Sequence, residues 1–310
     1  EQMTERDFAP AYLKLDAGSL RERVAALREL LRACSLCPRK CGVDRLSGQT
    51  GVCGVAAELV VSSYGPHFGE EAPLVGRFGS GTIFLTHCNL KCIFCQNYDI
   101  SHLGHGSVLS LQGLARMMLD LQARGCHNIN WVTPTHQAPM LVEALQLAGE
   151  QGLRVPVVYN CGGYESVEVL RLLEGIIDIY MPDAKYGDNE PGKQLSRVPD
   201  YWDRNREALA EMHRQVGDLQ VNHQGIALRG LLVRHLVLPN QMAGTDRVMA
   251  YLASLSRHTY VNVMAQYRPQ YRAHEVAAIS RPIASAEFRQ AIEAALGAGL
   301  TRLDDRRAWR

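Results

Sequence analysis

Three cysteines, Cys88, Cys92 and Cys95, stand in a C-x3-C-x2-C pattern directly after an apolar run over residues 82–85. Such a run indicates a β-strand, and a loop that leaves the end of a strand is where an α/β protein places its chemistry. Thiolates are soft ligands that select iron–sulfur clusters, zinc or copper(I). Three ligands are one short of the usual four, so the pattern predicts a metal site with one open position. A structural zinc knuckle or a disulfide cluster is the alternative.

Four more cysteines form a second group upstream. Cys34, Cys37, Cys41 and Cys53 follow the pattern C-x2-C-x3-C-x11-C, and prolines and glycines punctuate the segment. Four thiolates complete a zinc site or fill a second iron–sulfur cluster. Three alternatives therefore stay open, namely zinc, a second cluster, or reduced cysteines that only pack. A second cluster could relay electrons to the first, whereas zinc would only fold the segment.

The composition is that of an ordinary globular protein. The chain has 310 residues, of which 46% are hydrophobic and 21% charged, which suits one barrel-sized domain with a modest appendage. Its 33 basic and 32 acidic residues give a net charge of +1, so nothing favours a nucleic acid or a membrane as a partner. No apolar run approaches the ~18 residues that span a bilayer, and the polar start lacks the core of a signal peptide. Clustered cysteines then indicate a reducing, cytoplasmic location.

Strands and helices alternate from residue 82 onward. The expected strands cover residues 82–85, 128–132, 155–159, 176–181, 231–238 and 260–265. The expected helices cover residues 114–121 (capped by Ser110), 140–148, 167–173, 201–216, 247–255 and 288–296. Apolar strands that alternate with amphipathic helices are parallel and buried on both faces. Six such repeats are too few for a closed eight-stranded barrel, so the sequence predicts an α/β fold with a partial (β/α)6 TIM-like barrel.

Three parts of the chain are expected. Residues 1–74 form an N-terminal helix, capped by Ser19, and a cysteine-rich metal-binding extension. Residues 75–275 form the partial barrel, and residues 276–310 form a C-terminal helix and a charged, solvated tail.

The carboxyl ends of the strands are where such a barrel carries its site. The candidates there are Thr133, Thr135, Asn160, Cys161, Asp183, Lys185, Arg234 and Gln266. Asp183 and Lys185, two positions apart, point the same way and suit a polar ligand, with a surface ion pair as the alternative. Arg234 lies within an apolar strand and needs a partner, either a ligand carboxylate or a buried one such as Asp183. Cys161 is a candidate donor or acceptor of a hydrogen atom, with a packing role as the alternative.

The cysteine loop, with Phe94 just before its third cysteine and a strand before the loop, resembles the radical S-adenosylmethionine (SAM) superfamily. In that family the three cysteines bind three irons of a [4Fe-4S] cluster, and SAM chelates the fourth iron. The reduced cluster cleaves SAM to a 5′-deoxyadenosyl radical that abstracts a hydrogen atom. The resemblance implies that Cys88, Cys92 and Cys95 hold this cluster, and it implies the same incomplete barrel.

Other segments resemble a branch related to pyruvate formate-lyase activating enzymes. They include the Asp183-x-Lys185 motif, which lies at the SAM and substrate site of those enzymes, and residues 233–239 and 266–269. Where many members carry Gly-Gly-Glu-Pro, this chain has Thr-Pro-Thr-His over residues 133–136, whose hydroxyls or carbonyls would have to bind the SAM amino group. The resemblance implies a cofactor site built from Phe94, Thr133, Thr135, Asn160, Asp183, Lys185, Arg234 and Gln266.

The first functional hypothesis is a radical SAM enzyme that abstracts hydrogen from a protein or peptide, as a glycyl radical activase does, with a flavodoxin or ferredoxin as electron donor. The second is a radical SAM enzyme that acts on a small metabolite or tailors a peptide. The third is an iron–sulfur electron carrier or redox sensor that catalyses nothing. Polar groups at the strand ends argue against the third, because a bare carrier has no use for Asp183, Lys185 and Arg234 around its cluster.

Overall fold

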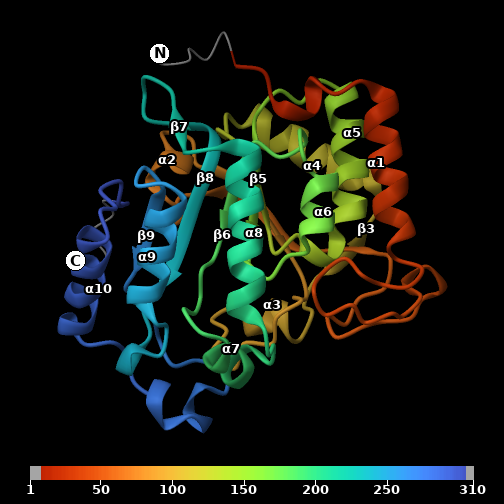
Figure 1. Ribbon diagram of the computed structural model, residues 1–310. Coiled ribbons are helices and arrows are strands. Elements are labelled where there is room, and N and C mark those ends of the chain that lie inside the picture. Colours follow the sequence, from red (N-terminus) through yellow and green to blue (C-terminus); the bar gives the residue numbers. More distant parts are fainter. Residues whose placement is uncertain (1–7, 305–310) are drawn as a thin grey trace.

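A computed structural model describes residues 8–304 of the chain. Within them the six predicted strands are present, all parallel, in the order β2-β4-β5-β6-β8-β9 (Figure 1). In this part of the chain β9 pairs with β8 and not with β2, so the sheet is open and the prediction of a partial barrel is confirmed. The strands are β2 (Ser80–Leu85), β4 (Ile129–Val132), β5 (Val157–Cys161), β6 (Ile179–Pro182), β8 (Ala227–Leu236) and β9 (Tyr260–Met264).

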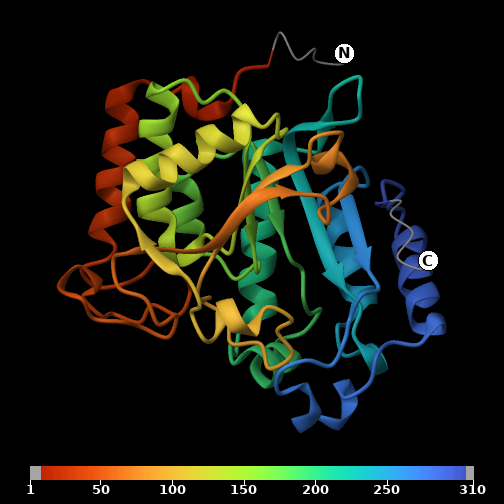
Figure 2. The same cartoon turned by 180° about the vertical axis from the view of Figure 1, so that it is seen from behind.

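The connecting helices lie outside the sheet (Figures 1 and 2). The Ser110 hydroxyl caps the first of them, as predicted, by accepting the amide of Gly113 at 3.0 Å. Apolar residues at helical spacing turn inward, and Leu114, Met118 and Leu121 of this helix are fully buried. The helices are α4 (Leu111–Ala123), α5 (Ala138–Glu150), α6 (Val167–Leu172), α8 (Tyr201–Val216), α9 (Thr245–Leu255) and α10 (Ser285–Gly297).

The N-terminal helix α1 (Ala17–Glu29) packs against α5 and α6. The prediction that Ser19 caps it is wrong, because the helix begins at Ala17, three residues before the first position that Ser19 could cap. Asp16 is the N-cap, and its carboxylate accepts the amide of Ser19 at 2.9 Å. An ion pair of 2.5 Å between Arg28 and Glu143 ties α1 to α5.

Two antiparallel strands extend the sheet beyond β2. Strand β1 (Leu59–His67) pairs with β2, and β3 (Ser107–Leu109) pairs with β1. The first of these pairings crosses residue 75, where we placed the start of the barrel, so the division into parts remains a proposal. Smaller elements are α2 (Ala72–Val75), α3 (Tyr98–Ser101), α7 (Asn189–Ser196) and β7 (Gln220–Val221), with 3₁₀ turns at Ala11–Leu13, Arg45–Ser47, Thr135–Gln137, Pro239–Gln241, Ala273–Glu275 and Ala277–Ile279.

The two ends of the partial barrel differ in chemistry. Leu74 from α2 is fully buried and packs in one apolar cluster with Val158, Ile179 and Leu232, whose strands form the barrel wall. Side chains within an apolar cluster of this kind leave no room for a ligand. At the carboxyl ends of the strands, where β8 and β9 point in Figure 1, the chain instead carries α3, α7 and long loops. That end is therefore the one available for chemistry.

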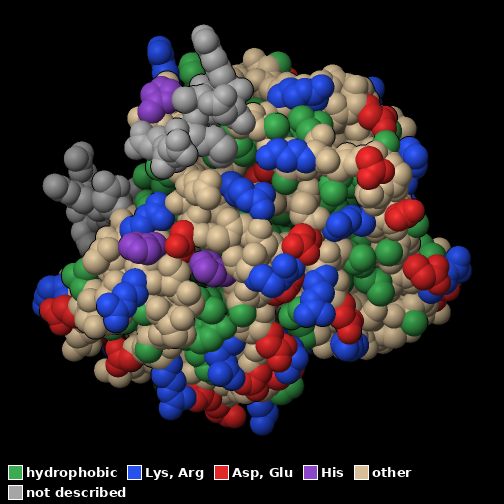
Figure 3. Space-filling view, turned by 45° about the horizontal axis from the view of Figure 1, so that its top comes forward, with side chains coloured by type: hydrophobic (Ala, Val, Ile, Leu, Met, Phe, Trp, Pro, Cys, Tyr) green, Lys and Arg blue, Asp and Glu red, His purple; other side chains and the backbone are tan. Residues whose placement is uncertain are grey.

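The surface carries charges of both signs. On the face shown in Figure 3, basic and acidic side chains are interspersed, in keeping with the near-zero net charge. None of the helices within residues 8–304 is both long and apolar enough to cross a membrane.

Candidate functional site

The cysteine loop is fixed from two sides by backbone hydrogen bonds. The amides of Lys91 and Ile93 donate to the carbonyls of Ser196, at 3.2 Å, and Leu195, at 2.9 Å, which are the last residues of α7. The Ile93 carbonyl accepts the amide of Arg272 at 2.8 Å. The loop is thus clamped between the end of α7 and the segment that follows β9.

Each of the three loop cysteines has a hydrogen-bonding neighbour. Cys92 Sγ lies 2.9 Å from the Ser196 hydroxyl, and Cys95 Sγ lies 3.0 Å from that of Ser101. Cys88 Sγ accepts the amide of Leu90 at 3.3 Å. Hydrogen bonds to the sulfurs are the contacts that cluster-bound thiolates make and that tune a cluster's potential. The donor set therefore fits an iron–sulfur cluster.

The three thiols also influence one another. Burial raises the pKa of Cys88 to about 12, and the charges of Cys92 and Cys95 add to the shift. Thiols that repel one another's charge in this way need a cation to become thiolates together. As the side chains stand, no three Cys, His, Asp or Glu groups among residues 8–304 are arranged to chelate an ion, so the sulfurs must turn toward a common point to bind one.

Polar side chains from β5, from β8 and from the segment directly after β6 form a network at the same end of the barrel. Arg234 Nε donates to Asp183 Oδ1 at 2.9 Å, and its Nη2 donates to Asn160 Oδ1 at 2.7 Å. Lys185 Nζ donates to Asp183 Oδ2 at 2.5 Å. Burial alone would raise the pKa of Asp183, but Arg234 and Lys185 outweigh it and hold that pKa below its usual value.

This network remains accessible and lies near the cysteine loop. The side chains of Asp183, Lys185 and Arg234 keep 14, 18 and 19% of their surface exposed. Burial raises the pKa of Cys92, and Lys185 opposes that shift, which places the ammonium within electrostatic reach of the sulfur. The structure thus brings together four predicted residues, and the buried partner considered for Arg234 is indeed Asp183.

Thr133 and Thr135 have different surroundings. Thr133 has φ +62°, a left-handed conformation that is strained for a β-branched residue, and His87 before the cysteine loop has φ +66°. Such strain clusters at functional sites. The hydroxyl of Thr135 is fully buried and donates to Glu165 Oε1 at 2.8 Å, so it is already engaged.

Cys161 also lies next to Glu165. Its thiol is buried and hydrogen-bonds to the Glu165 carboxyl. Side chains alternate along a strand, so Cys161 and Asn160 occupy opposite faces of β5. Asn160 reaches Arg234 on the inner face, whereas Tyr159, on the face of Cys161, donates to Glu165 at 3.3 Å. This position lends no support to a role for Cys161 in hydrogen-atom transfer.

Phe94 and Gln266 border the cysteine loop. Phe94 is buried and meets Tyr267 edge-on, with ring centroids 5.9 Å apart, so it supports the loop from within the core. Gln266 is exposed, and its carbonyl accepts the side-chain amide of Gln96 at 3.1 Å. Gln266 therefore stands at the rim of the site.

Sequence reasoning missed Ser196, Ser101, Glu165 and Glu71. The first two lie next to sulfurs, but a lone serine gives no pattern, and Ser196 is 104 positions from its partner Cys92. Glu71 reaches the inner face of the barrel, where its Oε1 accepts the amide of Asn262 at 2.9 Å. Its Oε2 is buried without a partner, and burial raises the pKa of this carboxyl.

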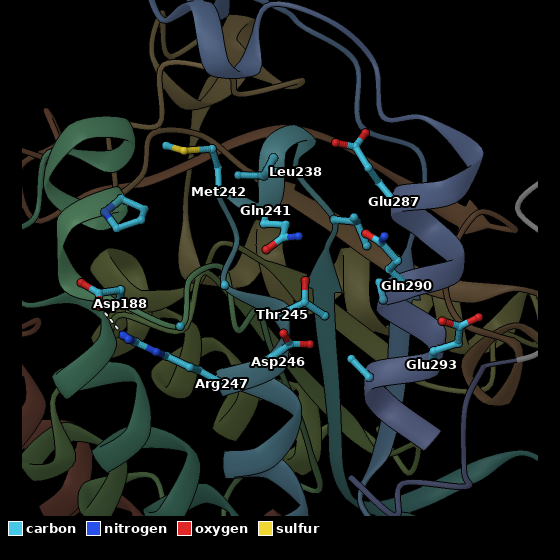
Figure 4. A pocket seen from close by; sticks show the side chains of 16 residues that line it. Asp188, Leu238, Gln241, Met242, Thr245, Asp246, Arg247, Glu287, Gln290 and Glu293 are labelled. Carbon is cyan, nitrogen blue, oxygen red and sulfur yellow. Dashed lines mark hydrogen bonds and ion pairs between the residues drawn. The ribbon is translucent and has the colours of Figure 1, made fainter. Parts of the chain in front are cut away.

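A separate pocket of about 610 Å³ lies between α9 and α10 (Figure 4). Arg247 and Asp188 form an ion pair across part of it, and Glu287 and Glu293 project from α10. None of the residues predicted for the site lines this pocket.

Comparison with known proteins places this site in a family. Residues 82–236, from β2 to the end of β8, match the model of the Radical SAM superfamily. The chain is 32% identical over 294 residues to "Uncharacterized protein MJ0674" of Methanocaldococcus jannaschii, a match that covers 92% of this chain and 80% of that protein.

The solved structures with a similar backbone have lower sequence identity to this chain. Methylornithine synthase (PylB) has 15% identity and a TM-score of 0.47, covering 98% of this chain and 82% of that one. Streptococcus suis SuiB, bound to the precursor peptide SuiA, has 13% identity and a TM-score of 0.45. The latter match covers 67% of this chain and 43% of SuiB, so the chain spans less than half of that protein. By the family model and the relative with 32% identity, the chain belongs to the radical SAM superfamily.

Proposed function

We propose that this radical SAM enzyme binds a [4Fe-4S] cluster through Cys88, Cys92 and Cys95 and reductively cleaves SAM there. The observation that carries the proposal is the position of the cysteine loop at the carboxyl end of β2, with a hydrogen-bonding group beside each sulfur and the Asp183 network nearby. When bound, the cluster supplies the electron that cleaves the sulfur–C5′ bond of SAM.

The network around Asp183 suits the polar half of SAM. Asp183 accepts hydrogen bonds from Lys185 and Arg234. It can release one of these two cations and accept hydrogen bonds from the hydroxyl groups of a ribose instead. Arg234 and Lys185 are donors that match a carboxylate, Arg234 with its planar fork. We assign to these three residues the binding and orientation of SAM. Thr133 would contribute its strained backbone, and Gln266 would contact SAM from the rim of the site.

We further propose a protein or peptide as the substrate that loses the hydrogen atom. This step rests on the resemblance of the Asp183-x-Lys185 segment to pyruvate formate-lyase activating enzymes, where the motif lies at the SAM and substrate site. The electron donor is then a flavodoxin or a ferredoxin.

The test of SAM cleavage is anaerobic. The reconstituted protein is treated with dithionite and SAM, and 5′-deoxyadenosine is measured. The wild type is expected to form it, and Cys92→Ala is expected to lose both this activity and one cluster. Cys126→Ala is the matched control, because Cys126 is a buried cysteine outside both groups. Full cleavage by Cys92→Ala would overturn the assignment.

The substrate class is tested with extract of the source cells, separated by ultrafiltration. A retained, protease-sensitive fraction that stimulates 5′-deoxyadenosine formation supports a protein or peptide. Stimulation that appears only in the filtrate and survives protease assigns the enzyme to a small metabolite instead.

A further inference from the structure

Arg45 is a buried cation with no carboxylate partner. Its side chain is 1% exposed, and within the described residues it forms no ion pair with Asp or Glu. Its Nη2 donates to the carbonyls of Ala56 and His136, both at 2.7 Å, and its Nε is buried without a partner. The sulfur of Cys34 lies 3.9 Å from Nη1. A buried guanidinium without a counter-charge is costly, and a thiolate at Cys34 would supply that charge.

Two more cations stand between the two cysteine groups. Arg39, which lies between Cys37 and Cys41 in sequence, donates through Nε to the carbonyl of Asn89 at 2.5 Å and through Nη2 to that of Ser196 at 3.5 Å. The Asn89 carbonyl belongs to the residue after Cys88. Arg39 thus ties the N-terminal group to the cysteine loop, and it forms no ion pair with a carboxylate among the described residues.

Lys91 interacts electrostatically with both cysteine groups. The Lys91 ammonium lies within electrostatic reach of Cys53, Cys88 and Cys92. Cys53 belongs to the N-terminal group and the other two to the loop. Like Arg39, Lys91 has no carboxylate partner in residues 8–304. A half-buried ammonium in this position can balance negative charge on both cysteine groups.

The segments that carry the two cysteine groups lie side by side. A Cβ atom added to Gly54 would lie 3.1 Å from Cδ2 of His87. Gly54 follows Cys53, and His87 precedes Cys88, so the backbone beside one cysteine group touches the side chain beside the other. A metal centre at the N-terminal group would therefore adjoin the cluster of the loop.

We propose that Cys34, Cys37, Cys41 and Cys53 hold a second iron–sulfur cluster that passes electrons to the cluster of the cysteine loop, with Arg45, Arg39 and Lys91 balancing its negative charge. Four thiolates give such a cluster a net negative charge. This charge would be the counter-charge for the three cations, which have no carboxylate partner. One electron from the flavodoxin or ferredoxin reduces the second cluster, which is reoxidised as the loop cluster gains that electron. The inference rests on the proposed function for its acceptor, and the contacts between the segments that carry the two groups favour a redox metal over zinc.

Metal content gives the first test. Iron, sulfide and zinc are counted after anaerobic reconstitution of the wild type, of Cys37→Ser and of the triple variant Cys88→Ser/Cys92→Ser/Cys95→Ser. The wild type is expected to hold about eight irons and each variant about four, since each cluster contributes four. About four irons with one zinc in the wild type would overturn the relay, and about four irons without zinc would overturn the second site.

Redox titration followed by electron paramagnetic resonance gives the second test and avoids variants that fail to fold. Removal of a nearby positive charge makes reduction less favourable. Lys91→Gln is therefore expected to lower the midpoint potentials of both clusters, and Arg45→Gln that of the N-terminal cluster alone. Arg32→Gln, an exposed arginine of the same segment that pairs with Glu29, is the control and should shift neither. Unchanged potentials in Lys91→Gln would overturn the electrostatic coupling.

The two proposals can fail separately. Eight irons without 5′-deoxyadenosine in the presence of dithionite, SAM and extract of the source cells would overturn the proposed function and leave the second cluster standing. Four irons with full 5′-deoxyadenosine formation would do the reverse.

Discussion

The hydroxyl of Ser196 lies 2.9 Å from the sulfur of Cys92, although 104 residues of chain separate them. The same hydroxyl is 2.7 Å from that of Tyr186, and the Ser196 carbonyl accepts the amide of Lys91. One residue at the end of α7 therefore fixes the central cysteine of the loop through both its side chain and its backbone.

Substitution Ser196→Ala is expected to lower the midpoint potential of the loop cluster and to speed its loss of iron. A hydrogen bond to a charged group contributes about 1.5–3 kcal/mol, and hydrogen bonds to sulfur favour the reduced cluster. Redox titration and iron release to a chelator measure the two effects. Ser110→Ala is the matched control, since it removes only the cap of α4 and costs about 1 kcal/mol of stability. An unchanged potential in Ser196→Ala would make Ser196 a purely structural residue.

Asp183→Asn and Arg234→Lys are expected to weaken SAM binding while iron content stays as in the wild type. Asp183→Asn, which removes the negative partner of this largely buried pair, also costs about 3–5 kcal/mol of unfolding free energy. Calorimetric titration with SAM and urea unfolding measure the two quantities. The exposed pair Arg204 and Glu207 provides the control, where Arg204→Gln should change stability by less than about 1 kcal/mol. Wild-type SAM affinity in both variants would move these residues to a structural role.

The pH dependence of stability should report Glu165. Burial raises its pKa from 4.5 to about 7, against hydrogen bonds from Thr135, Cys161 and Tyr159 that lower it. The folded protein thus binds a proton that the unfolded chain has lost, so this stabilisation is complete below pH 4.5 and disappears as the pH rises through 7. Its size is about 3 kcal/mol.

The variant Glu165→Gln should remove that part of the slope. Urea unfolding at several pH values, compared with wild type at each pH, measures it. Asp178, whose pKa burial also raises to about 7, and Glu71, whose pKa burial raises as well, contribute to the slope that remains. Glu168→Gln, an exposed carboxylate three residues away, is the control. A wild-type slope in Glu165→Gln would contradict the prediction.

Gly163 must stay glycine. Its φ is +76°, and a Cβ there would lie 2.0 Å from the carbonyl oxygen of Asp183. Gly163→Ala is expected to cost more than about 3 kcal/mol and to displace Asp183, which lowers SAM affinity as well. Gly152→Ala provides the comparison, because Gly152 has φ +103° and open space around it, so only the backbone cost of about 1–2 kcal/mol applies. Equal losses in the two variants would show that the contact with Asp183 is unimportant.

The parts of this protein that could be predicted are those with local signals. The six parallel strands follow from apolar runs, and the start of α4 follows from Ser110, because burial on both faces and capping act within a few residues. Asp183, Lys185 and Arg234 could be placed at one end of the barrel because parallel strands end together.

What escaped prediction depends on contacts between distant segments. The pairing of β1 with β2 crosses the boundary expected at residue 75, and nothing in residues 59–61 announces an antiparallel partner. The sequence suggested that the Thr135 hydroxyl could bind a ligand, but this hydroxyl already donates a hydrogen bond to Glu165, 30 residues away. Ser196 and Glu71 meet their partners only after the chain has folded back.

The clamp on the cysteine loop also determines when, during synthesis, the loop can take up its final conformation. Residues 195 and 196 hold one side of the loop and Arg272 holds the other, so the loop is not fixed on both sides until residue 272 has left the ribosome. Domains form as units once their residues are available. Iron insertion into a settled site therefore follows the synthesis of residue 272, and a chain truncated before that residue would carry Cys88, Cys92 and Cys95 and still lack half of the clamp on this loop.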